Sequence, residues 1–266
     1  MNQEMISASL WYYDDEYTYE TGKKILNVLE KQMFFQPTLF YAEKLTKNKL
    51  EKYTIESKEK YYKAFTDKNI QGIVFADPDP SSRTPYWSVD FTFPPSKEFL
   101  GFEPVIHPKN LIILQANLEM FKDEVFMDEF MDTVRALIGI VAPFYGIIDS
   151  SKNESRLLEE ANEEYFKPDE YIQTIFGGNY FGKKYCDLYG HEKVLDVPVE
   201  NKESINGGIL FMLSSNLLKF ADDTTDAKRR KVMQYLKIRK KRRFKLTSNL
   251  RLHYWTLALV VASLRA

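Results

Sequence analysis

The sequence has 266 residues, of which 44% are hydrophobic and 28% are charged, and its formal net charge is −1. This length and composition are typical of a globular protein with a sizeable core and exclude an intrinsically disordered chain. The single cysteine, Cys186, excludes the disulfide framework of a small secreted protein. The opening stretch, MNQEMISASLWYYDDEY, has neither a basic region nor a long apolar run, so we expect no signal peptide and a cytoplasmic location.

The near-neutral total conceals two segments of opposite charge. Residues 227–266 contain 13 of the 37 Lys and Arg residues and no Asp or Glu. This leaves 24 basic and 38 acidic residues in residues 1–226, an excess of 14 negative charges. An acidic body attracts basic proteins and repels nucleic acid, whereas a basic tail does the reverse.

The first half of the chain is rich in strand patterns. The clearest is YWSVDFTF, in which Trp87, Val89, Phe91 and Phe93 alternate with polar residues. Further strands are predicted over residues 5–11, 37–45, 70–77 and 110–121. Helices are predicted over residues 21–33, with Thr21 as the cap, and over residues 57–69.

Helical periodicity dominates from residue 122 onward. Over residues 123–141 an apolar stripe lies opposite a stripe formed by Glu124, Asp128 and Asp132. The apolar stripe consists of Phe126, Phe130, Val134, Leu137 and Ile138. Two strands, over residues 194–203 and 205–215, and a last helix over residues 226–241 complete the pattern.

This order of elements predicts an α+β fold. We expect a mixed or antiparallel sheet, formed by the N-terminal half and packed against helices, in one large domain. The predicted domain spans residues 1–236, and residues 237–266 form a basic and then apolar C-terminal tail.

No catalytic motif is recognisable. None of the three histidines, His107, His191 and His253, has a second histidine or Cys186 at a metal-ligand spacing. GxSxG, HExxH, paired CxxC and the phosphate-binding loops are all absent. The glycines of GGNYFG favour a bend or close packing, and Cys186 is expected to be a small buried group.

The best candidate set for a metal-dependent hydrolase is Asp77, Asp79 and Asp90, which flank a predicted strand. Asp-Pro turns explain the first two without a metal. We therefore expect no enzymatic activity, no metal and no cofactor.

Acidic residues cluster in three places, and in the first of them they are interleaved with tyrosines. Such clusters suit recognition of a basic protein, because charge speeds encounter and aromatic rings bury area at low entropic cost. The alternative is a solvated face that serves solubility. The candidate partner-binding residues are Tyr13, Asp14, Asp15, Glu16, Glu124, Asp128, Asp132, Glu160, Glu163 and Glu164.

The segment NYFGKKYCDLYGHEKVLDVPVENKESINGGILFMLSS combines an aromatic-glycine motif, a YGHEK motif, a VP break and an apolar strand. This plan resembles that of bacterial immunity proteins that accompany polymorphic toxins, such as immunity protein 52 and related type VI immunity families. The resemblance covers residues 5–236. It implies a non-enzymatic, cytoplasmic α+β protein that binds one cognate toxin domain and blocks it. The acidic clusters predict that this toxin domain is basic.

The tail begins with KIRKKRRFK, which has seven positive charges in nine residues, and continues into the apolar RLHYWTLALVVASLRA. An alternative function is therefore nucleic-acid binding through residues 228–245, with Phe244, Tyr254 and Trp255 stacking on bases. The apolar run is shorter than the roughly 20 residues that span a bilayer, so we expect no transmembrane span. Contact with an anionic membrane surface, docking on the body, solvation and a segment foreign to the fold are the other interpretations.

Overall fold

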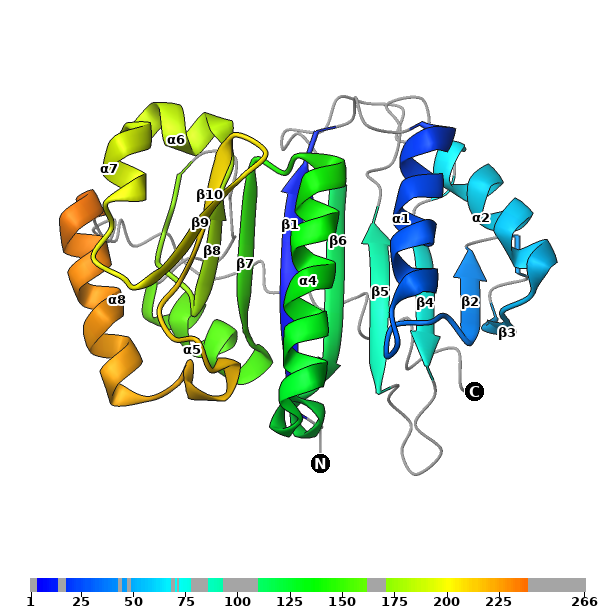
Figure 1. Cartoon of the computed structure of the whole chain (residues 1–266), viewed down its shortest axis with the longest axis horizontal. Coiled ribbons are helices and arrows are strands. Elements are labelled where there is room, and N and C mark those ends of the chain that lie inside the picture. The colour runs from blue at the N-terminus through cyan, green and yellow to red at the C-terminus, as the bar shows by residue number, and fades with distance from the viewer. Residues whose placement is uncertain are drawn as a thin grey trace, which may run out of the picture.

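The computed structural model describes residues 4–13, 18–42, 45–46, 49–67, 70, 72–77, 86–92, 110–161 and 171–238. Its centre is one antiparallel sheet with the strand order β3-β2-β4-β5-β6-β1-β7-β8-β10-β9 (Figure 1). The strands are β1 (Met5–Tyr12), β2 (Leu39–Ala42), β3 (Glu51–Lys52), β4 (Gly72–Asp77), β5 (Trp87–Thr92), β6 (Asn110–Asn117), β7 (Tyr145–Ser150), β8 (Gly178–Phe181), β9 (Asn201–Ile205) and β10 (Gly208–Met212). The predicted α+β class is confirmed.

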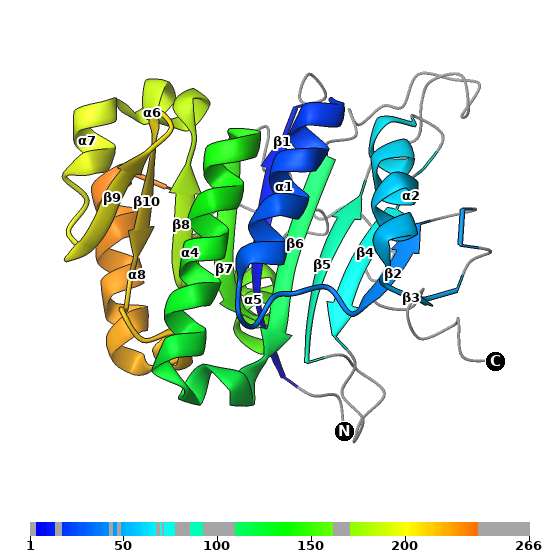
Figure 2. The same cartoon turned by 45° about the vertical axis from the view of Figure 1, so that its right-hand side comes forward.

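Helices cover the two faces of this sheet at opposite ends. On one face α1, α2 and α4 pack over β1, β6, β5 and β4, and on the other face α5 to α8 pack over β7, β8 and β10 (Figures 1 and 2). The helices are α1 (Tyr19–Lys31), α2 (Ile55–Thr66), α4 (Glu124–Val141), α5 (Ser151–Ala161), α6 (Lys183–Tyr189), α7 (His191–Leu195) and α8 (Asp223–Leu236). Short 3₁₀ segments, Leu118–Lys122 and Leu217–Lys219, precede α4 and α8.

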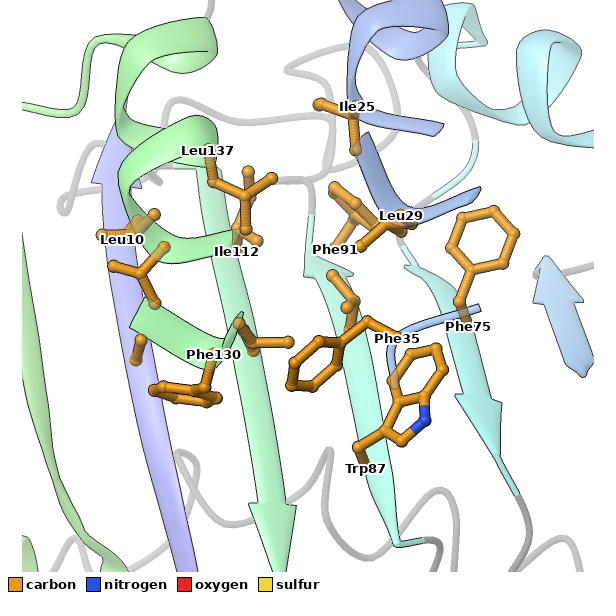
Figure 3. Packing of buried hydrophobic residues seen from close by; sticks show 14 of the residues in the cluster. Leu10, Ile25, Leu29, Phe35, Phe75, Trp87, Phe91, Ile112, Phe130 and Leu137 are labelled. Atoms are coloured by element: carbon orange, nitrogen blue, oxygen red, sulfur yellow. The ribbon is translucent and has the colours of Figure 1, made fainter. Parts of the chain in front are cut away.

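The first hydrophobic core lies between α1, α2, α4 and one face of the sheet (Figure 3). Alternate residues of each strand point into it, so that Leu10 of β1 lies opposite Ile112 of β6. Phe35 follows α1 and packs against Trp87 and Phe126, with ring centroids 5.4 and 5.2 Å apart. Each such side chain contributes about 1.5–3 kcal/mol when it is fully buried, so this core anchors α4 firmly.

The second core lies on the opposite face of β7, β8 and β10. Tyr145 of β7 points into it, whereas Ile148 points into the first core. Every residue of β7 is buried because helices cover both of its faces. The helices close the second core through Leu157, Tyr185, Val194 and Val232.

The glycines of GGNYFG lie where another part of the chain leaves no room for a side chain. A Cβ atom on Gly177 would overlap the ring of Phe220, and one on Gly182 would overlap the carbonyl oxygen of Pro143. The prediction of close packing is therefore confirmed.

Several element boundaries differ from the predictions. Thr21 does not cap α1, because the Thr18 hydroxyl accepts a hydrogen bond from the backbone N–H of Thr21 at 3.0 Å. The sheet is not confined to the N-terminal half, since β7 to β10 extend it. Much of the predicted strand over residues 194–203 is the end of α7 and a loop. The hairpin of β9 and β10 turns at Asn206 and Gly207, whose φ angles of 49° and 75° suit a two-residue turn.

The C-terminal tail lies outside the described residues from residue 239 onward. The predictions made for it therefore stay predictions. Among the helices that the structure describes, none combines the length and the apolar character needed to cross a membrane.

Candidate partner-binding surface

The predicted acidic stripe of α4 is present and faces solvent. Asp123 caps the helix by accepting a hydrogen bond from the backbone N–H of Val125 at 2.9 Å. Glu124, Asp128 and Asp132 follow at four-residue spacing and are all exposed. The predicted apolar stripe is buried in the first core. Acids in the first turn of a helix also interact favourably with its dipole, which offsets part of their mutual repulsion.

Two of these carboxylates have no partner within the described part of the chain. Neither Glu124 nor Asp128 has a hydrogen bond or an ion pair there. Asp132 is bound by Arg135 at 2.8 Å, and the same arginine reaches Glu203 of β9 at 2.7 Å. The first turns of α4 therefore carry negative charges that no described residue neutralises, whereas Arg135 partly neutralises the charge of Asp132 in the middle of the helix.

Exposed apolar side chains accompany this charge. Val125, between the acids on α4, is 59% exposed, and Met33, in the loop after α1, is 63% exposed. Met33 is held beside α4 because the backbone N–H of the next residue, Phe34, donates to Glu129 at 2.6 Å. We call Met33, Glu124, Val125, Asp128 and Asp132 the α4 surface. Sequence reasoning missed Met33 and Val125, although a valine within a polar helical stripe was a signal for the second.

The other predicted binding residues do not join the α4 surface. Tyr13 follows β1 and stacks on Phe144, three residues after the C-terminal end of α4, with centroids 4.7 Å apart; Lys184 donates a hydrogen bond to its hydroxyl. Glu160 lies on α5, across the sheet from α4, and pairs with Arg156 at 2.7 Å. Asp14, Asp15, Glu16, Glu163 and Glu164 lie outside the described residues.

The basic segment proposed for nucleic-acid binding is only partly available. Of its four basic residues on α8, Arg229 is 4% exposed and is used inside the protein. Its Nε donates to the carbonyl oxygen of Ile175 at 2.8 Å, and it pairs with Asp226. Residues 239–245, which hold most of the remaining charge, lie outside the described residues.

The candidate metal ligands do not converge. Cross-strand pairing places Asp77 opposite Trp87, which points into the first core, whereas Asp90 lies opposite Val74 on the other face. Asp79 lies outside the described residues, and within the described ranges no group of three or more metal-ligating side chains is assembled.

Cys186 and His191 show no catalytic arrangement. Cys186 is buried, and its Sγ donates to the carbonyl oxygen of Phe181 at 3.1 Å. Burial raises the pKa of this thiol, so the nucleophilic thiolate is disfavoured. His191 is exposed at the start of α7, while His107 and His253 lie outside the described residues.

The environment of Asp90 should make the stability of the folded protein depend on pH. Burial raises its pKa from 3.8 to about 6, although Ser88 and Gln115 donate hydrogen bonds to the carboxylate at 2.8 and 3.1 Å. The folded protein therefore holds this proton more tightly than the unfolded chain does. The contribution of Asp90 to stability is full below about pH 4 and is lost as the pH rises to about 6.

We expect Asp90→Asn to remove this pH-dependent loss while keeping an oxygen that accepts hydrogen bonds. The increase in Tm over the wild type should be larger at pH 8 than at pH 4.5, as measured by thermal unfolding in both buffers. If the Tm difference between the variant and the wild type is the same at both pH values, then the pKa of Asp90 is not raised in the folded protein.

The comparisons with known proteins bear on the fold. No family model matches this sequence, and no curated protein matches it. Among solved structures, that of the Pseudomonas aeruginosa T6SS protein PA0821 is similar, with a TM-score of 0.63 and 14% sequence identity. The similarity covers 98% of this chain and 81% of that chain. At this identity the two proteins share a fold, and a function has to be argued from the site.

Proposed function

We propose that this chain is a cytoplasmic, immunity-type binding protein that neutralises a cognate bacterial toxin by covering the toxin's functional surface with the α4 surface. The observation that carries the proposal is that two exposed carboxylates, Glu124 and Asp128, have no partner among the described residues and lie beside the exposed Val125. Two further findings support it: the similar structure belongs to a protein named as a T6SS protein, and the sequence plan resembles type VI immunity families.

The α4 surface has the chemistry of a protein-binding site for a basic partner. The segment Leu118–Val141 contains six acidic and two basic residues, so its field attracts cations. Complementary charge raises the rate of association and suppresses wrong partners. Val125 and Met33 supply apolar area that loses water on contact, which adds a hydrophobic contribution to the attraction between charges.

Occlusion requires no reaction by this chain. A bound protein that covers a catalytic or receptor-binding surface blocks it by steric exclusion alone. A rigid support is an advantage, because preorganisation reduces the entropy lost on binding. The first core gives α4 that support, since Phe126, Phe130 and Leu137 are fully packed beneath it.

Co-expression tests the proposed activity. Each toxin encoded next to this gene is produced in a bacterial host, with and without this chain, and growth is followed. We expect one neighbouring toxin to arrest growth and this chain to relieve the arrest. If no neighbouring gene product is neutralised, the proposed function is wrong.

Charge reversal tests the assigned surface. We expect the triple variant Glu124→Lys, Asp128→Lys and Asp132→Lys to lose protection, with the Kd for the toxin domain raised about 100-fold or more, because like charges then face each other. Binding is measured with the purified proteins by calorimetry.

The matched control reverses three exposed acids elsewhere, in the variant Glu192→Lys, Asp196→Lys and Glu200→Lys. It changes the net charge by the same amount and should bind as the wild type does. If the control loses affinity as strongly as the α4 variant, binding depends on overall charge or on another face, and the α4 assignment is wrong.

A further inference from the structure

Helices α5 and α8 lie on the face of the sheet opposite to α4 (Figure 1). Between these two helices is a cavity of about 220 Å³. Sites for drug-sized ligands have volumes of roughly 300–1,000 Å³, so this cavity fits a smaller molecule. The side chains that line it include Leu157 and Glu160 of α5, Thr174, and Asp226, Arg230 and Met233 of α8.

A chain of ion pairs joins the two helices beside the cavity. Arg156 of α5 pairs with Glu160 at 2.7 Å and with Asp226 of α8 at 3.0 Å. Asp226 also pairs with Arg229, which lines the cavity, is 4% exposed and donates to the carbonyl oxygen of Ile175. Both carboxylates of the cavity wall are therefore already neutralised by arginines of the protein itself.

Arg230 is left over from this chain of pairs. Its side chain is exposed at the rim of the cavity and has no ion pair or hydrogen bond in the part of the chain that the structure describes. With Arg156 and Arg229 it makes three arginines around two carboxylates, so one positive charge is in excess. A ligand with one negative charge balances this excess, whereas a cation is repelled.

The rest of the cavity offers apolar surface and one hydroxyl group. Leu157 is 2% exposed and belongs to the second core, and Met233 packs against the same core. The Oγ1 atom of Thr174 lies 3.9 Å from the Sδ atom of Met233, and a thioether sulfur is a weak acceptor. This hydroxyl is therefore able to donate to a ligand oxygen instead. A planar carboxylate also suits the forked donors of a guanidinium group such as that of Arg230.

We propose that the cavity between α5 and α8 binds a small molecule that carries a single carboxylate on a compact apolar body. The carboxylate pairs with Arg230 and accepts a hydrogen bond from the Thr174 hydroxyl, while the apolar body packs on Leu157 and Met233. Binding there is independent of the proposed toxin binding, because the α4 surface lies on the opposite side of the sheet. The ligand contacts both helices at once, so its binding stabilises the folded protein.

Thermal unfolding of the full-length chain tests the class of ligand. The probes are benzoate, hexanoate, benzyl alcohol, benzylamine and inorganic phosphate, at equal concentration and equal ionic strength. We expect at least one of the two carboxylates to raise Tm by about 2 °C or more, and the other three probes to change it by less than about 0.5 °C. The proposal is overturned if neither carboxylate raises Tm, or if the alcohol, the amine or phosphate raises it equally.

Variants of α8 test the position of the site, with the carboxylate that binds as the ligand and calorimetry as the measurement. Arg230→Gln should raise the Kd at least about tenfold, because it removes a charged hydrogen bond. The matched control is Lys228→Gln, which removes the same charge from the same helix at a residue that does not line the cavity, and its Kd should equal that of the wild type.

Thr174→Val gives a second readout that does not change the charge. It removes the hydroxyl but keeps the shape of the side chain, and the Kd should rise about threefold or more. Equal losses of affinity in Arg230→Gln and Lys228→Gln would show attraction by overall charge and overturn the proposal. Unchanged affinity in both Arg230→Gln and Thr174→Val would overturn it too, because the carboxylate would then bind elsewhere.

Discussion

Replacing Arg229 with alanine is expected to lower the free energy of unfolding by about 3 kcal/mol, because the change leaves two buried carbonyl oxygens without this donor and removes positive charge near a buried carboxyl group. Arg229 donates to the carbonyl oxygens of Ile175 and Phe220 at 2.8 and 3.4 Å, and it pairs with Asp226. Its charge also offsets part of the burial that raises the pKa of the fully buried Asp149. Since domains have a total stability of about 5–15 kcal/mol, the loss is large.

Urea unfolding measures this effect, and the neighbouring residue supplies the control. Arg230 carries the same charge on the same helix but is exposed. Its replacement by alanine should change stability by no more than about 0.5 kcal/mol. If the two alanine variants unfold at the same urea concentration, then the buried network around Arg229 contributes nothing specific.

Replacing Gly182 with alanine is expected to cost about 3 kcal/mol, because the new methyl group meets backbone that cannot move away. A Cβ at this position would lie 2.9 Å from the Cα of Phe144 and would overlap the carbonyl oxygen of Pro143. The backbone N–H of Gly182 also donates to the carbonyl oxygen of Phe144 at 3.1 Å, which holds the two segments together. Thermal and urea unfolding of the purified variant measure the loss.

The control is Gly139→Ala on α4, where no atom lies within 4 Å of the new methyl group. Alanine there should raise stability by about 0.5–1 kcal/mol, because it reduces the conformational freedom of the unfolded chain in a helical segment. Opposite signs for the two glycine variants are the expected result. A stabilising Gly182→Ala would show that β8 and the loop before β7 are packed less tightly than described.

Sequence periodicity predicted the elements that have one polar and one apolar face. The strand at Trp87–Thr92 alternates apolar and polar residues, and the helix at Glu124–Val141 repeats its apolar residues every three to four positions. Both patterns arise because one side of each element packs on a core. Strands β7 and β8 were missed for the opposite reason. Both are buried along their whole length, so the residues of YGIIDS and GNYF show no alternation, and two of them are glycines.

The candidate site was predicted in part. The acidic stripe of α4 follows from four-residue spacing, which is a local property of a helix. Tyr13, the α4 stripe and Glu160 lie apart because of how the helices are arranged around the sheet. The spacing of residues along the sequence does not encode this arrangement. Met33 joins the α4 surface through long-range contacts of the next residue, Phe34, which donates to Glu129, 95 positions away in the chain, and packs on Phe126.

Carboxylate labelling of the complex tests the central claim most directly. The chain is treated with a carbodiimide and an amine, alone and bound to its toxin domain, and the labelled positions are read by mass spectrometry. We predict that binding protects Glu124 and Asp128 strongly and leaves Glu192 and Glu200 unchanged. Unchanged labelling of Glu124 and Asp128 in a saturated complex would contradict the claim that this helix faces the partner.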